Sequence, residues 1–173
     1  MNFYLQIFLD FNLYNYFYFT KPNLKGEIMN EISQKLLTRL YQDSKIGELA
    51  SEEVMQKCKD ANFKKIIADQ LAQYKAISKE CEDFAKANEF DVPDNSGFKK
   101  FKQTAMINMS LFFNCNDRRI AEMMITGTIM GVIDAIKALY DLDKADMEVL
   151  TIGKKLKTMQ EKYIEALKKY LEG

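Results

Sequence analysis

Two acidic residues lie at positions that the surrounding sequence marks as buried. Asp43 falls at helical spacing within an apolar stripe, and Asp134 does the same further along the chain. The other members of these stripes are Leu36, Leu40 and Gly47 for Asp43, and Met124, Gly127 and Gly131 for Asp134. A charged carboxylate in a protein core is costly unless it is paired, protonated or bound to a metal. Both positions therefore need a chemical explanation.

One explanation is a metal site that uses carboxylates alone, with Asp43, Glu122 and Asp134 as its ligands. Iron and manganese sites in helix bundles take a Glu from each of two helices and Glu-x-x-His from the other two. This chain contains no His, so that pattern cannot form. The remaining inward candidates, Gln70, Gln160 and Glu161, do not restore it. An iron or manganese site is therefore the alternative interpretation.

The preferred interpretation needs no cofactor and treats both acids as members of a buried polar network or of a solvated edge of the bundle. In this network Asp43 and Asp134 bond Tyr41, Tyr74, Tyr163 or a lysine across the bundle. The absence of His also removes the commonest proton shuttle near neutral pH. Catalysis by Ser-His or Cys-His pairs is excluded, and we predict a protein that is not an enzyme.

Glycines form a second unusual pattern within the predicted helices. Gly127 and Gly131 lie four residues apart in one helix, where each costs about 1 kcal/mol of helix propensity. We predict that they allow another helix to pack closely, and that Gly47 and Gly153 do so on other helices. The alternative is a gap beside Gly47, Gly127 and Gly131 that holds a small apolar ligand or a partner helix.

Helical periodicity in the rest of the chain shows which elements must position these residues. Apolar residues at three- and four-residue steps predict four helices, over 31–58, 63–88, 98–140 and 145–171. Breakers and capping residues over 92–97 predict a reversal, and turn-forming residues near 113–117 interrupt the third helix. The expected fold is all-α: an antiparallel up-down four-helix bundle.

The overall composition narrows the partners and the compartment. The 25 basic and 25 acidic residues cancel, so no net field attracts nucleic acid or an anionic membrane. We therefore predict neither partner. Three cysteines without a C-x-x-C spacing indicate reduced thiols and a cytoplasmic protein.

The first 28 residues differ from the rest of the chain. They hold nine of the 21 aromatic residues and show neither a helical nor a strand period. A basic region and a cleavage site are lacking, and polar residues interrupt any membrane span. The composition is what AT-rich DNA encodes, and Lys25-Gly26-Glu27-Ile28 can be encoded by a ribosome-binding element just before Met29. We predict that 1–28 is an untranslated or disordered extension and that 29–173 forms the domain.

Three segments together resemble an uncharacterised family of ferritin-like bundle proteins from low-GC Gram-positive bacteria. They are Tyr41-Gln42-Asp43-Ser44-Lys45-Ile46-Gly47, the stretch from Phe63-Lys64-Lys65 to Gln70-Leu71-Ala72-Gln73-Tyr74, and residues 120–134. The resemblance covers about 29–171 and implies a ferritin-like fold. It favours a structural protein, related to stress or sporulation, that acts by association and forms a homodimer.

Overall fold

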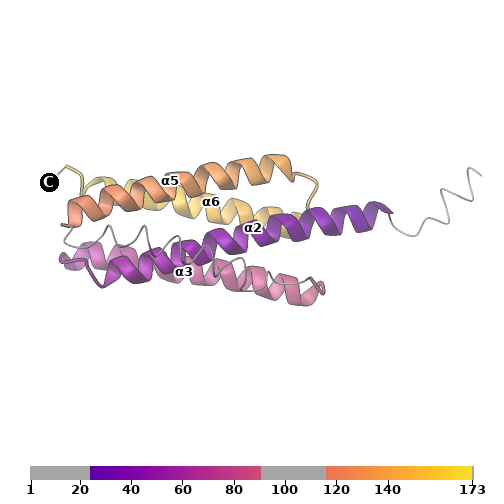
Figure 1. Ribbon diagram of the computed structural model, residues 1–173, viewed down its shortest axis with the longest axis horizontal. Coiled ribbons are helices and arrows are strands. Elements are labelled where there is room, and N and C mark those ends of the chain that lie inside the picture. The colour runs from indigo at the N-terminus through magenta and orange to yellow at the C-terminus, as the bar shows by residue number, and fades with distance from the viewer. Residues whose placement is uncertain (1–23, 91–115, 173) are drawn as a thin grey trace, which may run out of the picture.

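The computed structural model describes residues 24–90 and 116–172, with only the backbone described for residues 24–30. Four helices account for most of the described chain: α2 (Leu24–Met55), α3 (Ala61–Ala87), α5 (Asp117–Asp141) and α6 (Met147–Lys168). They lie side by side along one long axis (Figure 1). The predicted all-α four-helix fold is confirmed. The predicted helix over 98–112 and most of the predicted break near 113–117 lie outside the described residues.

Side chains at the helix starts explain where three of the helices begin. Asp60 accepts a hydrogen bond from the Phe63 backbone N–H at 2.7 Å, and Asn116 accepts one from the Arg119 N–H at 2.9 Å. Asp146 accepts one from the Glu148 N–H at 2.8 Å. Each side chain satisfies a backbone donor that has no partner within its own helix. The predicted restart of a helix after the 113–117 region therefore has a local cause at Asn116.

Contacts between the helix ends fix the direction in which each helix runs. The Asp117 carboxylate accepts hydrogen bonds from the backbone N–H groups of Lys59 and Asp60, at 3.0 and 2.7 Å, so α5 begins beside the start of α3. The Asp146 N–H donates to the Ser33 hydroxyl at 2.7 Å, so α6 begins near the start of α2. Helices α2 and α3 are antiparallel, as are α5 and α6, but α3 and α5 run in the same direction. The described helices therefore do not simply alternate in direction: α3 and α5, which residues 91–115 separate in the sequence, run the same way.

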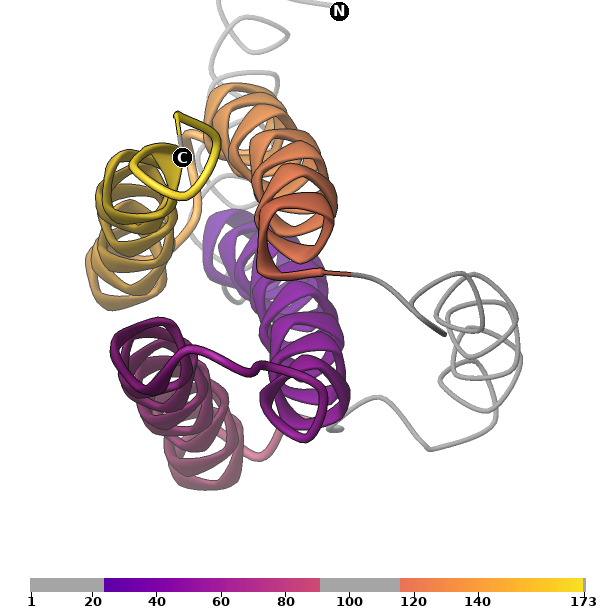
Figure 2. The ribbon, with the colours of Figure 1, turned by 90° about the vertical axis from the view of Figure 1, so that its left-hand side faces the viewer.

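The helices are arranged as two antiparallel pairs, α2 with α3 and α5 with α6, which Figure 2 shows nearly end-on. Buried apolar residues form two clusters, each drawn from all four helices. One cluster includes Leu36, Leu40, Ile77, Ala138, Leu156 and Met159, and the other includes Val54, Phe63, Ile67, Ile120, Met124 and Leu167. On α2, α3 and α5 the stretch between these clusters contains polar residues and glycines. Of the three predicted metal ligands, Asp43 and Asp134 lie in that stretch and Glu122 does not.

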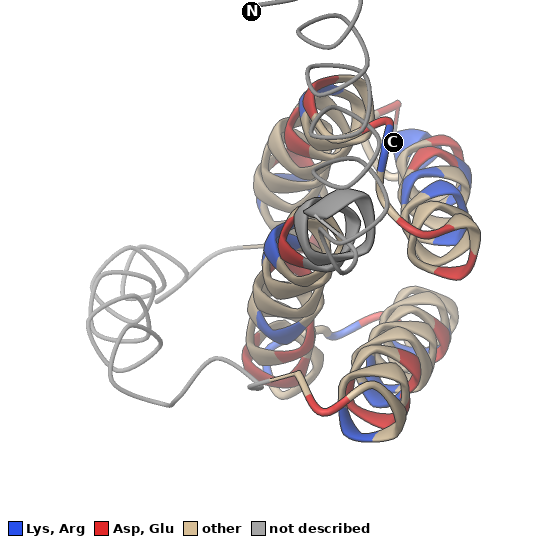
Figure 3. Ribbon diagram, turned by 90° about the vertical axis from the view of Figure 1, so that its right-hand side faces the viewer, with Lys and Arg blue, Asp and Glu red and all other residues tan. Residues whose placement is uncertain are grey.

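Helix α5 differs from the other helices in its surface. Acidic and basic side chains are distributed over all four helices, and none carries one sign alone (Figure 3). Among the described helices α5 is the one long and apolar enough to cross a membrane by length and composition, a test that core helices of bundles also pass. Three of its isoleucines are between 40% and 48% exposed, namely Ile129, Ile133 and Ile136. Helix α5 therefore has apolar residues both on its core side and on its surface.

Candidate functional site

A pocket of about 320 Å³ lies among the four helices in the polar stretch between the two core clusters. Helix α2 contributes Asp43, Ile46, Gly47 and Ala50; α3 contributes Gln70 and Tyr74; α5 contributes Met123, Met124, Gly127, Thr128, Met130, Gly131 and Asp134; α6 contributes Gln160. Much of this lining is apolar, while its polar groups come from separate helices. Ligand pockets commonly combine an apolar wall with a few placed polar groups.

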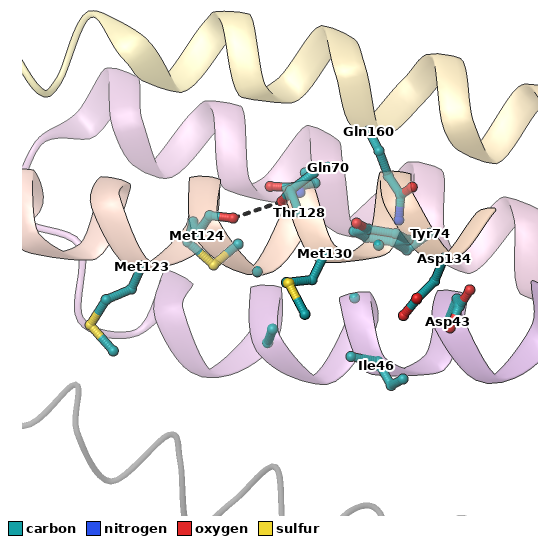
Figure 4. Close-up of a pocket in the computed structure, with 14 residues that line it drawn as sticks. Asp43, Ile46, Gln70, Tyr74, Met123, Met124, Thr128, Met130, Asp134 and Gln160 are labelled. Atoms are coloured by element: carbon teal, nitrogen blue, oxygen red, sulfur yellow. Dashed lines mark hydrogen bonds between the residues drawn. The ribbon is translucent and has the colours of Figure 1, made fainter. Parts of the chain in front are cut away.

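The fully buried amide of Gln70 is the most unusual group in this lining. Gln70 is 0% exposed, and neither its Oε1 nor its Nε2 makes a hydrogen bond. The side chain lies beside Thr128, whose hydroxyl donates its proton to the Met124 carbonyl at 2.8 Å and so has none to donate to the Gln70 oxygen (Figure 4). Buried amides without partners are rare because desolvation costs about 1–3 kcal/mol that no bond recovers. Gln70 therefore presents one donor and one acceptor to the pocket.

Gln160 and Tyr74 extend this polar surface from α6 and α3. Gln160 is 2% exposed and its Oε1 has no hydrogen-bond partner. Its side chain points toward the Tyr74 ring in Figure 4. Burial raises the pKa of the Tyr74 hydroxyl, whereas the neighbouring side chains of Gln160 and Gln70 act to lower it. The negative charge of Asp43 adds a smaller upward contribution and Thr128 a smaller downward one, so the phenol is neutral near pH 7. The hydroxyl can both donate and accept, which adds to what the pocket offers a ligand.

Asp43 and Asp134 come together, whereas Glu122 lies apart from them. Figure 4 shows the two aspartates side by side, one from α2 and one from α5. Burial, and then the charge of Asp134, raises the pKa of Asp43 to about 7, while Arg39 acts in the opposite direction. Glu122 is exposed on α5 and pairs with Arg119 at 2.6 Å, about 18 Å from Asp134 along the helix at 1.5 Å per residue.

The donor set near the aspartates determines how well a metal ion fits. Within residues 24–90 and 116–172 no three His, Cys, Asp or Glu side chains are grouped closely enough to hold an ion. Iron and manganese in helix bundles are held by at least four carboxylates together with histidines. The described residues supply only Asp43 and Asp134 at this point. The predicted three-carboxylate set is therefore not assembled, and we derive no metal chemistry from it.

The tyrosines that were predicted to bond the inward acids have other partners. The Tyr163 hydroxyl donates to Asp69 at 2.5 Å, which joins α6 to α3. Burial raises the pKa of Tyr41 to about 12, with further contributions from the neighbouring Glu82. Only Tyr74 lies close enough to Asp43 to feel its charge. The predicted network therefore extends over different acids, and Asp43 and Asp134 make no ion pair with any described residue.

The four glycines differ in what lies beside them. A Cβ atom at Gly47 would overlap the Tyr74 ring, and one at Gly131 would lie 2.5 Å from the Gln160 amide nitrogen. At Gly153 the nearest atom would be Leu139 Cδ2, at 2.8 Å. These three positions admit side chains from neighbouring helices. At Gly127 nothing lies within 4 Å, so the close-packing explanation is wrong there: the missing side chain leaves open space in the pocket.

In comparisons with known proteins, no family model, curated protein or solved structure matches this chain. The resemblance to ferritin-like bundle proteins therefore stays a prediction. The site itself must support any functional conclusion. Sequence reasoning had named Gln70 and Gln160 only as unsuitable metal ligands, although a glutamine within an apolar helical stripe is the available signal for a buried polar group.

Proposed function

We propose that this chain is a cytoplasmic, non-enzymatic protein that binds a small molecule in the pocket between its helices. The observation that carries the proposal is the Gln70 amide, which is 0% exposed and has no hydrogen-bond partner on either atom. Free thiols at Cys58 and Cys81 are compatible with a reducing compartment. The cost of burying the amide is recovered when a ligand supplies the missing hydrogen bonds.

The chemistry of the amide indicates what the ligand presents to it. A glutamine side chain offers a donor and an acceptor side by side, so its best partner offers an acceptor and a donor in the same arrangement. Primary amides, lactams and the edges of nucleobases have this arrangement. The rest of the ligand contacts Met123, Met124 and Met130, whose flexible thioether side chains adapt to an apolar shape. The pocket volume of about 320 Å³ suits a ligand built on one ring.

The test uses benzamide, a one-ring primary amide, as a defined probe in isothermal titration calorimetry. We expect the wild-type protein to bind it and Gln70→Leu to bind it at least about tenfold more weakly, since each 1.4 kcal/mol corresponds to a factor of ten. Gln73→Leu is the matched control, because Gln73 is exposed on the same helix and lies outside this pocket. Lack of binding to the wild-type protein contradicts the proposal. Equal binding to Gln70→Leu contradicts it as well.

Association into a homodimer is a second proposed property, supported by the exposed surface of α5. Ile129, Ile133, Ile136 and Tyr140 form one stripe along this helix, and all four are exposed. Their spacing of four, three and four residues reads the same from both ends. A two-fold axis would therefore place Ile133 against Ile136 of a second copy. This stripe lies about 130° around the helix from Asp134, at 3.6 residues per turn, so association leaves the pocket open.

Sedimentation equilibrium tests the association. We expect a dimer for the wild-type protein and a monomer for Ile133→Lys, because a charge in an apolar interface loses its hydration. Met147→Lys is the control, since Met147 is also an exposed apolar residue but lies at the start of α6 outside the stripe. A wild-type monomer overturns the proposal. So does a dimer that Ile133→Lys leaves intact.

The helix directions support the predicted ferritin-like relationship. Among the described helices, α3 and α5 run in the same direction, and ferritin-like bundles, which have one long crossover connection, also contain two successive helices of the same direction. The relationship concerns ancestry and fold, because function depends on the site residues and not on the fold. We propose that the chain retains this architecture and uses the bundle interior for an organic ligand in place of metal ions.

A further inference from the structure

The pocket contains a second polar feature, the pair formed by Asp43 and Asp134. Asp43 is half-buried and Asp134 is exposed, so the pair lies where the pocket meets the surface. Each of the four helices contributes one charged or polar side chain near Asp43. These are Arg39 on α2 itself, the neutral phenol of Tyr74 on α3, Asp134 on α5 and the uncharged Gln160 on α6. Arg39 forms no ion pair with either aspartate.

Two adjacent carboxylates attract a cation, and here the nearby charge of Arg39 acts on Asp43 without forming an ion pair with it. The lining around them favours an organic cation over a metal ion, because Ile46 and Met130 are apolar and the other nearby ligand atoms are few. Calcium takes six to eight oxygen ligands, and magnesium keeps an octahedral shell. An alkylammonium group needs only about three acceptors, and its carbon atoms pack against apolar side chains. The unpartnered Gln70 amide in the same pocket independently indicates an organic ligand.

The two polar features lie at a separation that one molecule can span. Gln70 lies beside Thr128, and Asp134 follows Thr128 six positions later on α5. That interval corresponds to about 9 Å along the helix axis at 1.5 Å per residue. A ring that carries an amide at one end and an aminomethyl group at the other has a similar length. One ligand can therefore contact the buried amide and the carboxylate pair together.

We propose that the pocket binds a small organic cation, with a neutral amide-like head at Gln70, an apolar body along the methionines and an ammonium group between Asp43 and Asp134. This inference rests on the proposed small-molecule function and adds the charge and polarity of the ligand to it. The ammonium group donates hydrogen bonds to both carboxylates. Its positive charge also offsets their mutual repulsion, so the pair favours a cation over a neutral molecule of the same shape.

Calorimetry with three probes of matched shape tests the proposal: benzamide, para-aminomethylbenzamide and para-carboxybenzamide. We expect the aminomethyl probe to bind about tenfold more tightly than benzamide at pH 8, and the carboxy probe to show no binding, because it is repelled by the aspartates. Asp134→Asn should remove the advantage of the aminomethyl probe over benzamide. Asp141→Asn, at an exposed acid at the end of α5, should change neither.

The pH dependence supplies a readout that the fold alone does not produce. Because the pKa of Asp43 is about 7, the aminomethyl probe should lose affinity between pH 8 and pH 6, while benzamide should not. Benzamide binding without any advantage for the aminomethyl probe refutes the organic cation and leaves the small-molecule function intact. Failure of both probes refutes the function itself. Stoichiometric binding of manganese chloride that Asp134→Asn abolishes refutes the organic cation in favour of a metal.

Discussion

Two buried polar side chains, Glu48 on α2 and Gln70 on α3, have very different surroundings. Glu48 is 6% exposed, and both of its oxygens are bonded: Oε2 to the Lys45 ammonium at 2.7 Å, and Oε1 to the Ser78 hydroxyl at 2.5 Å. Gln70 is 0% exposed, and neither of its polar atoms has a partner. A carboxylate is the more costly group to bury, yet it is the one that the protein fully satisfies. The bundle can therefore satisfy buried polar groups, and leaves Gln70 unsatisfied at the pocket.

This difference in hydrogen bonding distinguishes Glu48, a polar group that stabilises the fold, from Gln70, a polar group proposed to bind a ligand. Glu48 and Ser78 join α2 to α3 in the absence of any other molecule. Gln70 contributes nothing comparable to the free protein, and its amide becomes useful only when a ligand is bound. Buried polar groups without hydrogen-bond partners are expected at functional sites, because the free energy lost by leaving them unpaired must be offset by another benefit, such as ligand binding.

The same substitution at both residues gives the largest expected effect, because the results should have opposite signs. Glu48→Leu should lower the free energy of unfolding by about 2 kcal/mol, since it removes a charged hydrogen-bond network and leaves Lys45 unpaired. Gln70→Leu should raise it by about 1–2 kcal/mol, since it removes an unsatisfied amide of similar volume. Urea unfolding of the ligand-free proteins measures both. A loss of stability in Gln70→Leu as large as in Glu48→Leu would show that the amide is satisfied after all.

The acid at the pocket mouth, Asp43, should make the stability of the protein depend on pH. The pKa of Asp43 is raised from 3.8 to about 7, so the folded protein holds this proton more tightly than the unfolded chain. Stability is then lost as the pH rises from about 4 to 7, and the full penalty applies above pH 7. Asp43→Asn should therefore stabilise the protein at pH 8 by about 2 kcal/mol, less than the full shift implies, because the half-buried site is partly screened. At pH 4 the variant and the wild type should have equal stability.

Thermal unfolding across this pH range checks the prediction, with Asp141→Asn as the exposed control. The difference between Asp43→Asn and the wild type should grow between pH 4 and pH 7 and then stay constant. A difference that does not change with pH would indicate that Asp43 stays charged throughout. In that case the aspartate pair would resemble Glu48, with a partner that satisfies it.

Much of the fold could be predicted from sequence because its causes are local. Helical periodicity located the apolar stripes, and capping residues such as Asp60 and Asn116 lie where α3 and α5 begin. The direction of α5 could not be predicted, because it depends on contacts between distant segments, such as Asp117 with the backbone of Lys59. The stripe positions of Asp43 and Asp134 predicted that both face inward. Asp43 is half-buried, but Asp134 is exposed where the pocket meets the surface, so the prediction of a buried acid is wrong for Asp134. The separation of Asp134 from Glu122 follows from the helical rise between them on α5, about 1.5 Å per residue.

The hydrogen bonding of the pocket residues could not be predicted from the sequence, because it also depends on contacts between helices. Periodicity indicates which face of a helix is buried, but not which groups a buried side chain meets there. Gln70 and Glu48 both lie on buried faces, and only the opposing helix decides that Ser78 bonds one while nothing bonds the other. Glycines pose the same difficulty. Gly47 and Gly127 are equivalent in sequence terms, yet the Tyr74 ring covers the first and open space adjoins the second.

The smallest expected effect on stability concerns Gly47 and Gly127, of which the first is covered by a side chain and the second adjoins open space. Gly47→Ala should destabilise the protein by about 1–2 kcal/mol, because the added Cβ overlaps the Tyr74 ring and forces it to move. Gly127→Ala should stabilise it by about 0.5–1 kcal/mol, because the new methyl group meets no atom and alanine favours the helix. If Gly127 is present to leave room for a ligand, the more stable variant should bind benzamide more weakly. Unchanged binding together with higher stability would leave Gly127 without a role in the pocket, so chemical unfolding and calorimetry on the same protein distinguish the two explanations.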